Sequence, residues 1–280
     1  MKQSSLGHQA RKRFGQNFLQ NPGIIRRIIR AIHPKPGQHL VEIGPGLGAL
    51  TEELLAAAGE LDVVELDRDL IPILRTQFFR YEQNFRIHEA DALKFDFAQL
   101  ANDERPLRVV GNLPYNISTP LIFHLLSHSG LIEDMYFMLQ KEVVERLAAH
   151  PGDSAYGRLS IMAQYYCEVS NLFLVGPEAF HPKPKVDSAI VKLKPYPTPP
   201  HLADNPKDFE TLVRTAFTQR RKTLRNNLKQ LLPVELIEEV GIDPGIRPER
   251  ISLPEFVTLA NRYSLYLQQQ SQSESENTHE

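Results

Sequence analysis

The 280-residue sequence contains a single cysteine, Cys167, so it can form no disulfide within the chain and no zinc site built from several cysteines. It also lacks a run of about 18 uncharged apolar residues, which argues against a membrane-spanning helix. The polar, basic N-terminus has no apolar stretch before a small-residue cleavage site, so a secretory signal is not expected. These absences favour a cytoplasmic protein with no membrane partner. Nothing in the sequence indicates an obligate partner chain, so a monomer is expected.

Acidic residues are missing from two segments of the chain, although the formal net charge is −2. Residues 1–30 contain seven lysines and arginines and no acid, and residues 211–229 contain six and no acid. Phosphate binding depends on a local basic surface rather than on total charge, so both segments are candidate nucleic-acid contacts. The alternative is that they form two solvated helix faces.

Short apolar runs alternate with segments of helical spacing through the first part of the chain. This alternation predicts an α/β fold with a doubly wound, mostly parallel sheet. The expected strands are 39–43, 61–66, 85–88, 108–111 and 134–139, and the expected helices are 24–32, 51–58, 70–79, 120–127 and 141–149. Two later runs, 169–174 and 186–193, suggest an antiparallel pair of strands joined by a long Pro-rich loop.

A Pro-rich segment at 195–206 marks the predicted domain boundary. Only helical periodicity follows over 207–268, which predicts a small α-helical C-terminal domain. The end of the chain has almost no apolar residues and is expected to be disordered. The predicted division is a larger domain at 1–200, a helical domain at 201–270 and a tail at 271–280.

A glycine-rich loop, Gly44-Pro45-Gly46-Leu47-Gly48, lies between the first predicted strand of the sheet and a helix. Glycine permits backbone angles that other residues resist, and doubly wound sheets bind nucleotides at this position. Glu65 ends the second strand, where a carboxylate can accept both ribose hydroxyls of an adenosine moiety. Asp91 ends the third strand and can accept a hydrogen bond from the adenine amino group, although Asp there is as often a helix N-cap. NAD and S-adenosylmethionine fit these residues comparably.

The four residues Asn112-Leu113-Pro114-Tyr115 follow the fourth predicted strand, at the carboxyl edge of the sheet. The exocyclic nitrogen of adenine is a poor nucleophile because its lone pair is delocalised into the ring. The side-chain oxygen of Asn112 and the carbonyl of Leu113, held outward by Pro114, can accept hydrogen bonds from the two N–H groups. Tyr115 can stack on the base. The motif favours methylation of an amine over a plain turn with a core tyrosine, and this chemistry needs no general base of tuned pKa.

Phe180 lies in the Pro-rich loop, which should cover the same edge of the sheet. It is a candidate for the second face of a clamp around the base. The alternative is an aromatic side chain that only anchors the loop.

Together these motifs resemble the rRNA adenine N6,N6-dimethyltransferase family over residues 9–265. The resemblance rests on Gln16-Asn17-Phe18-Leu19, 42–48, Glu65-Leu66-Asp67, Asp91-Ala92, 112–115 and 180–188. Residues 217–228 are most similar to the bacterial small-subunit (16S) rRNA branch. The resemblance implies a Rossmann-like class I methyltransferase fold with S-adenosyl-L-methionine as the methyl donor. It also implies dimethylation of two adjacent adenosines in a loop near the 3′ end of 16S rRNA, late in small-subunit assembly.

The resemblance further implies roles for individual residues. Those expected to contact the cofactor are Asn17, Leu19, Gly44, Gly46, Glu65, Asp91 and Asn112. Those expected to position the target base are Asn112, Leu113, Pro114, Tyr115 and Phe180. Gln16 and the basic Arg11-Lys12-Arg13 are expected near the mouth of the site, and no metal is expected.

The second basic segment contains Arg220, Arg221, Lys222 and Arg225. We expect a helix of about three turns that packs through Leu224, Leu228 and Leu231 and presents the basic residues to rRNA phosphates. Three other functions stay open: a large-subunit rRNA adenine methyltransferase of the antibiotic-resistance type, an NAD-dependent dehydrogenase, and a non-enzymatic assembly or transcription factor. The dehydrogenase would need a hydride-handling His or a Tyr/Lys pair, and nothing in the sequence points to one.

Overall fold

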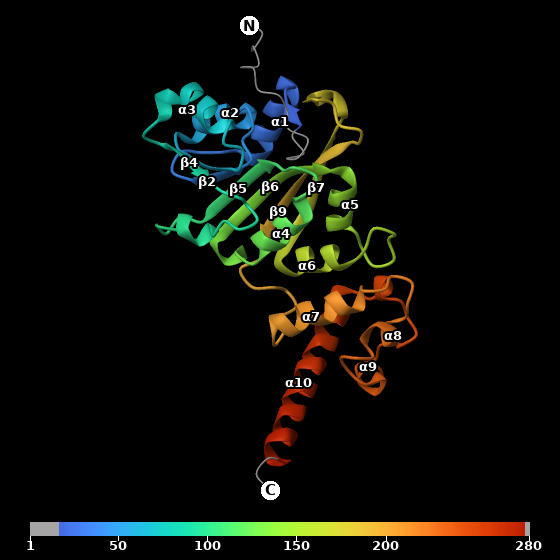
Figure 1. The fold of residues 1–280 in the computed structure, drawn as a ribbon. Helices are drawn as coiled ribbons and strands as arrows, with labels where there is room; N and C mark the ends of the chain where they lie inside the picture. The colour runs from blue at the N-terminus through green and yellow to red at the C-terminus, as the bar shows by residue number, and fades with distance from the viewer. Residues whose placement is uncertain (1–16, 278–280) are drawn as a thin grey trace. The chain divides into compact units, whose positions relative to one another are not determined.

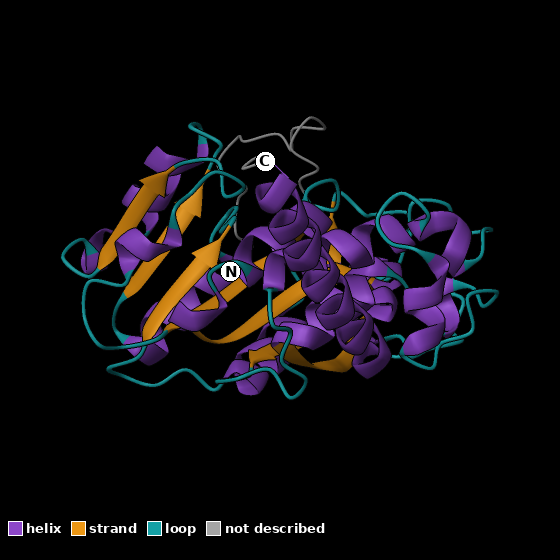
Figure 2. Cartoon of the chain, turned by 90° about the horizontal axis from the view of Figure 1, so that it is seen from below, coloured by secondary structure: helices purple, strands orange, loops and turns teal. Residues whose placement is uncertain are grey.

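The computed structural model describes residues 17–277, so the expectations for Gln16 and for residues 11–13 lie outside the described residues. A seven-stranded sheet with the order β4-β3-β2-β5-β6-β9-β7 forms the centre of the fold (Figures 1 and 2). The first five of these strands run parallel, and β9 runs antiparallel to β6. The predicted α/β fold is confirmed. The strands are β2 His39–Ile43, β3 Leu61–Glu65, β4 Phe85–Glu89, β5 Leu107–Asn112, β6 Ile132–Gln140, β7 Cys167–Val175 and β9 Ser188–Pro195.

The helices that precede or connect the first five strands and follow β6 are α1 Pro22–Ile32, α2 Ala49–Ala58, α3 Leu70–Gln77, α4 Ser118–Leu126 and α5 Lys141–Ala148. The first shows how local sequence specifies a helix. The Asn21 side chain accepts hydrogen bonds from the backbone N–H groups of Gly23 and Ile24, at 2.9 and 3.1 Å. Pro22 occupies the first helical position, where its missing N–H costs nothing. Single 3₁₀ turns lie at Phe79–Tyr81, Phe97–Leu100, Ser129–Leu131, Pro177–Ala179 and Pro248–Arg250.

A second, two-stranded sheet was not predicted. In it β1, Phe18–Leu19, pairs antiparallel with β8, Phe180–His181. The backbone N–H groups of Gln20 and Asn21 both donate to the carbonyl of Ala179, at 2.8 and 3.3 Å. Strands of two residues leave no periodic signal in a sequence. The pairing ties the start of the described chain to the Pro-rich loop.

The two ends of the parallel strands differ in character. At the amino ends, buried charges are paired: Arg108 on β5 donates to Asp134 on β6 at 2.9 and 3.0 Å. Burial raises the pKa of Asp62, but hydrogen bonds from neighbouring side chains outweigh this and hold it well below its usual range. The partners of Asp62 are His39, His88 and Arg86. These charged groups therefore pair with one another at the amino ends. In doubly wound sheets, ligands bind at the opposite edge, beyond the carboxyl ends of the strands.

The chain divides into two compact units, Met1–Val144 with Glu168–Pro195, and Glu145–Cys167 with Tyr196–Glu280. The second unit contains α6 Arg158–Tyr166, α7 Pro206–Ala216, α8 Leu224–Leu228, α9 Val234–Glu239 and α10 Leu253–Asn277. The sequence predicted a single domain boundary near residue 200. It did not predict that residues 145–167 group with the C-terminal helices. Ser160 explains part of this grouping, since its hydroxyl caps the start of α6 and bonds the carbonyl of Arg146.

The three-turn helix expected over residues 220–229 is wrong. Arg220, Arg221 and Lys222 lie in a turn between α7 and α8, and only Arg225 lies on a helix. The reason is the Asn227 side chain, which bonds the backbone N–H and carbonyl of Gln219 at 3.1 and 3.2 Å and closes the turn. The expected packing of Leu224 and Leu228 is confirmed, because both are fully buried, but Leu232 rather than Leu231 is the third buried leucine.

The tail is also more ordered than expected, since α10 continues to Asn277. Its Gln and Glu residues extend a helix that has already been nucleated by packed residues such as Phe256 and Leu259. Residues 278–280 lie outside the described residues.

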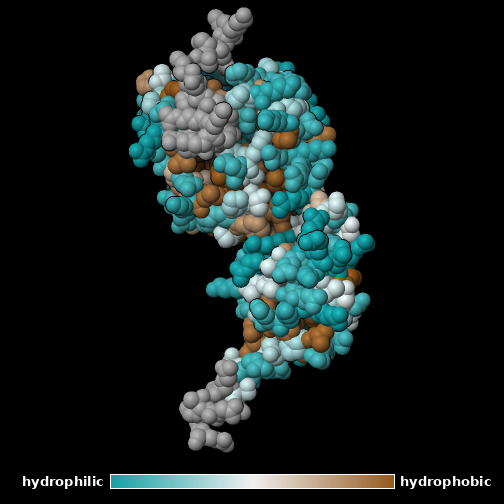
Figure 3. Space-filling model, turned by 45° about the vertical axis from the view of Figure 1, so that its right-hand side comes forward, coloured by the Kyte–Doolittle hydropathy of each residue, from teal (hydrophilic) through white to brown (hydrophobic). Residues whose placement is uncertain are grey.

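Within residues 17–277, no helix is long and apolar enough to cross a membrane. Most of the face in Figure 3 is hydrophilic, with smaller apolar areas. No group of three or more His, Cys, Asp or Glu side chains in the same residues could hold a metal ion.

Candidate active site

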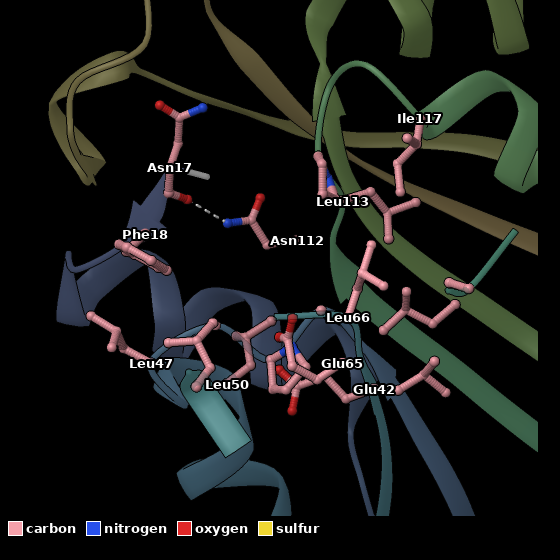
Figure 4. A pocket seen from close by; sticks show the side chains of 18 of the residues that line it. Asn17, Phe18, Glu42, Leu47, Leu50, Glu65, Leu66, Asn112, Leu113 and Ile117 are labelled. Carbon is pink, nitrogen blue, oxygen red and sulfur yellow. Dashed lines mark hydrogen bonds between the residues drawn. The ribbon is translucent and has the colours of Figure 1, made fainter. Parts of the chain in front are cut away.

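A cavity of about 310 Å³ opens at the carboxyl ends of the parallel strands. Residues from the glycine loop, from the ends of β3 and β5, from the segment around Asp91 and from β1 meet there, whereas the Pro-rich loop and the basic segment around Arg220 contribute none. The lining includes Asn17, Leu19, Gly44, Gly46, Glu65, Asp91, Asn112, Leu113, Pro114 and Tyr115. Figure 4 shows Asn17 and Asn112 on one side of the cavity and Glu42 and Glu65 on another. A volume of this size suits one small organic ligand.

The glycine loop forms one wall of the cavity because its backbone takes a shape that favours glycine. Gly44 and Gly46 have φ values of 64° and 59°, in the left-handed region. A Cβ atom on Gly46 would lie 3.1 Å from the ring of Phe18. The loop therefore packs directly against β1, and a side chain at Gly46 would separate them.

Glu65 is the carboxylate at the end of β3, and it is only 6% exposed. Its Oε1 accepts a hydrogen bond from the backbone N–H of Asp67 at 2.7 Å. Burial raises the pKa of Glu65 to about 7, because backbone hydrogen bonds only partly offset the loss of water. In its ionised form, a carboxyl group in the cavity wall can accept hydrogen bonds from a ligand that carries O–H or N–H donors.

Glu42 is a second buried carboxyl group in the cavity wall, and the site prediction did not include it. It lies on β2, accepts a hydrogen bond from the Thr51 hydroxyl at 2.6 Å and is 2% exposed. Burial raises the pKa of Glu42 to about 8, and the neighbouring Glu65 adds to the increase. An acidic residue within a strand whose other residues are buried was the signal for it in the sequence.

Asp91 lines the cavity and also caps a turn. Its Oδ1 accepts a hydrogen bond from the backbone N–H of Leu93 at 3.0 Å. The sequence left two interpretations of Asp91, an acceptor for the adenine amino group and a cap. They are compatible, since one carboxylate oxygen holds the turn and the residue also lines the rim of the cavity.

Asn112 ends β5 with its side chain fixed in one orientation. Its Nδ2 donates to the backbone carbonyl of Asn17 at 2.9 Å, as Figure 4 shows. A carbonyl can only accept, so this bond identifies the nitrogen of the amide and leaves Oδ1 as the acceptor that faces elsewhere. Gly111, just before it, permits the close packing of β5 on β2, because a Cβ there would lie 2.6 Å from the carbonyl oxygen of Ile43.

Tyr115 lines the cavity, and its hydroxyl makes a hydrogen bond to a residue outside the cavity lining. Its Oη lies 2.6 Å from the Oγ of Ser188, the first residue of β9, which is fully buried. Burial raises the pKa of the Tyr115 phenol, so it keeps its proton at neutral pH. The sequence prediction gave Ser188 no role in the site.

Phe180 is placed differently from the other predicted residues. It pairs with Leu19 in the two-stranded sheet and is 5% exposed, packed in the core rather than in the cavity lining. This burial matches the alternative interpretation, an aromatic residue that anchors the loop. Its contact with a base stays a prediction.

The basic residues Arg220, Arg221, Lys222 and Arg225 belong to the second unit, and all four are exposed. We call these four residues the basic turn. The guanidinium of Arg220 donates to the carbonyl of Ser154 within the same unit. The basic turn is therefore accessible to a polyanion, although three of its residues lie in a turn and not on the expected helix.

Comparison with known proteins places the chain among enzymes that modify ribosomal RNA. Residues 7–264 match the family model described as ribosomal RNA adenine dimethylase. A protein of Hahella chejuensis named ribosomal RNA small subunit methyltransferase A is 66% identical over 257 residues, which cover 92% of this chain and 94% of that protein. The protein of the same name from Pseudomonas aeruginosa is 64% identical, over 91% of this chain and 95% of its own length.

Solved structures agree in fold. A dimethyladenosine transferase from Plasmodium falciparum is 31% identical with a TM-score of 0.73, over 86% of this chain and 95% of that one. The 23S rRNA methyltransferase ErmE is 26% identical with a TM-score of 0.68, over 89% and 100%. The small C-terminal helical region and the mostly parallel sheet described above are thus those of a Rossmann-like class I methyltransferase.

Proposed function

The chain belongs to the ribosomal RNA adenine dimethylase family, and we propose that it dimethylates the N6 amines of two adjacent adenosines near the 3′ end of 16S rRNA, with S-adenosyl-L-methionine as the methyl donor. The identities of 62–66% to proteins named for the small subunit, against 26% to ErmE, favour this substrate over the large-subunit alternative. The proposed partner is 16S rRNA in a small ribosomal subunit or its precursor, bound by a monomer.

The cavity suits the adenosine and methionine parts of this cofactor. Glu65 accepts hydrogen bonds from the ribose hydroxyls, and Asp91 accepts one from the adenine amino group. The backbone of Gly44 and Gly46 lines the methionine end together with Asn17 and Leu19. The bound cofactor supplies an activated methyl group on a sulfonium, so the protein needs only to hold and orient the amine that receives it.

The target amine is held by acceptors at the end of β5. In the first transfer, the Oδ1 of Asn112 and the carbonyl of Leu113 each accept a hydrogen bond from one N–H of adenine N6. In the second transfer, the monomethylated amine has one N–H left and keeps one of these two bonds. These bonds turn the nitrogen lone pair out of conjugation with the ring and toward the methyl donor. Pro114 shapes the turn that presents the carbonyl, and Tyr115 stacks on the ring of the base. Phe180 is buried outside the cavity lining, so its proposed contact with the base would require the loop to move, and we assign it a secondary role.

The observation on which this proposal rests is the Asn112 amide, whose nitrogen is occupied by the Asn17 carbonyl at 2.9 Å. With the nitrogen so engaged, the amide offers an acceptor where an amine must be bound. An amide that rotated freely would offer a donor half of the time and would repel the N–H groups of adenine.

The experiment is methyl transfer to small ribosomal particles by Asn112→Ala. We expect transfer to fall by at least about 100-fold, the size of effect seen when one oriented polar group is removed from an active site. Calorimetry should find cofactor affinity within a few-fold of wild type. Asn102→Ala is the matched control, since Asn102 is exposed in the loop before the amino end of β5. Normal turnover by Asn112→Ala would refute the role, and transfer only to large-subunit RNA would refute the substrate.

The basic turn of the second unit is the proposed rRNA contact. Its exposed guanidinium and ammonium groups bind phosphates, which fix the position of the RNA and give little base selectivity. The base itself is selected by the residues around Asn112, from an unpaired segment of the RNA.

A further inference from the structure

Within the 112–115 motif, Tyr115 has a side-chain hydrogen bond to a side chain from a distant part of the chain, that of Ser188. A tyrosine ring rotates about two side-chain bonds, and a stacking surface is useful only if its plane is fixed. The backbone of Tyr115 is held locally, because its carbonyl accepts a hydrogen bond from the Ser118 hydroxyl at 3.2 Å. The ring is held at its far end by Ser188, at 2.6 Å from Oη to Oγ.

Ser188 is itself fixed by the sheet. It begins β9 and lies opposite Gln140 at the end of β6. The residue before it is also held by the backbone, since the N–H of Lys141 donates to the carbonyl of Asp187 at 2.9 Å. Ser188 is fully buried, so its hydroxyl has no water to exchange with and remains on Tyr115.

The antiparallel direction of β9 brings this serine to the catalytic edge. Asn112 lies opposite Met138 on β6, and Met138 lies opposite Ile190 on β9. Ser188 therefore stands two residues beyond Ile190 along β9, toward the side on which β5 ends in Asn112. β6, which pairs with the end of β5 at Asn112, thus also pairs with the start of β9 and sets the position of the residue that bonds the Tyr115 hydroxyl.

We propose that Ser188 is a positioning residue for methyl transfer, whose hydroxyl fixes the plane of the Tyr115 ring so that the target adenine stacks in line with the acceptors on Asn112 and Leu113. This inference rests on the proposed function. Ser188 touches neither cofactor nor base. Its effect passes through one hydrogen bond, so it should disappear when Tyr115 has no hydroxyl.

The test is a double-mutant cycle with Ser188→Ala, Tyr115→Phe and the double variant, measured as single-turnover methylation of small ribosomal particles. Each single variant should lose about 2- to 10-fold in rate, the effect of one buried hydrogen bond. The double variant should lose no more than either single variant, because both changes remove the same bond. Losses that multiply in the double variant would overturn the proposal.

A second measurement reports the stacking directly. An rRNA fragment with 2-aminopurine at the target adenosine loses fluorescence when the base stacks on an aromatic ring, and it lacks the 6-amino group, so no transfer occurs. Wild type should quench this probe, and Ser188→Ala and Tyr115→Phe should both quench it less. Unchanged quenching in both variants would overturn the proposal, even if their turnover fell.

Controls separate a positioning role from a structural one. Ser160→Ala removes another buried serine hydroxyl, one that bonds the carbonyl of Arg146 in the second unit. It should lower stability without changing the quenching. If Ser188→Ala does not fold, Tyr115→Phe still probes the bond from its partly exposed side, and normal quenching and rate in that variant would refute the proposal. A wild-type protein that methylates no adenine amine would refute the proposed function and this inference with it, whereas multiplied losses in an active enzyme would refute only the inference.

Discussion

Cofactor binding should release a proton from Glu65. The carboxyl is protonated in about half of the free molecules at neutral pH, because burial raises its pKa to about 7. Asp67, from the turn after β3, also disfavours its charge, and the neighbouring Glu42 from β2 has its own pKa raised to about 8. Two ribose hydroxyls can both donate to Glu65 only when its carboxyl group is ionised. Cofactor binding therefore lowers the pKa of Glu65, and affinity should rise with pH.

The size of the effect follows from the fraction ionised. At pH 6 about one free molecule in ten has an ionised Glu65, and at pH 8 about nine in ten do. Affinity should therefore rise about tenfold between these pH values, or about 1.4 kcal/mol. The number of protons released should be about 0.9 at pH 6 and about 0.1 at pH 8.

Calorimetry in two buffers of different ionisation enthalpy measures both quantities. Glu65→Gln is the matched control, since it retains the size of the side chain and cannot ionise. Any proton that the cofactor itself gives up is common to both proteins, so the difference between them reports Glu65 together with the neighbouring Glu42, whose pKa Glu65 raises. Equal proton release by the two proteins across this range would show that the reasoning is wrong.

Two other predictions follow from the charged groups described above. Glu42→Gln should stabilise the protein at high pH: the folded-state pKa of about 8 lies above the ordinary 4.5, so the protonated acid is favourable at low pH and this contribution is lost as pH rises toward 8. The gain relative to wild type should grow between pH 5 and pH 9 by on the order of 3 kcal/mol, measured by urea denaturation, and a pH-independent difference would contradict it. Arg221→Ala with Arg225→Ala should weaken binding to small-subunit RNA and reduce the steepness of its salt dependence by about two phosphate contacts, as measured by filter binding from low to high salt. An unchanged salt dependence would remove both residues from the interface.

Much of the sheet could be predicted because strands buried on both faces leave short, nearly continuous apolar runs in the sequence. Strands such as β2 and β3 are buried at every position, and the short apolar runs at 39–43 and 61–66 located them closely. The cavity could be predicted because parallel strands end at one edge, so Gly44, Glu65, Asp91 and Asn112 had to meet there. These inferences need only local spacing and the direction of the strands.

The features that were missed depend on side-chain contacts that residue spacing alone does not indicate. Ser188 follows a Pro-rich loop, and nothing near it in the sequence indicates that it meets Tyr115. Asn227 looked like an ordinary helical residue, yet its amide closes a turn onto Gln219 and ends the expected helix. Glu42 was recognised as part of a motif, but its protonation depends on Thr51 and on the depth of the cavity.

The pairing of β1 with β8 also bears on when the site can form as the chain is made. Glu65, Asp91 and the glycine loop are all synthesised early, and the parallel strands beneath them can assemble from residues up to 140. The partners of the catalytic motif come later: β8 must be present to hold the segment that contains Asn17, and β9 must enter between β6 and β7 to bring Ser188 to Tyr115. A growing chain would thus gain a place for its methyl donor before it gains an oriented Asn112 and Tyr115. Ribosome-bound chains that stop short of residue 180 should bind the cofactor more readily than they transfer its methyl group.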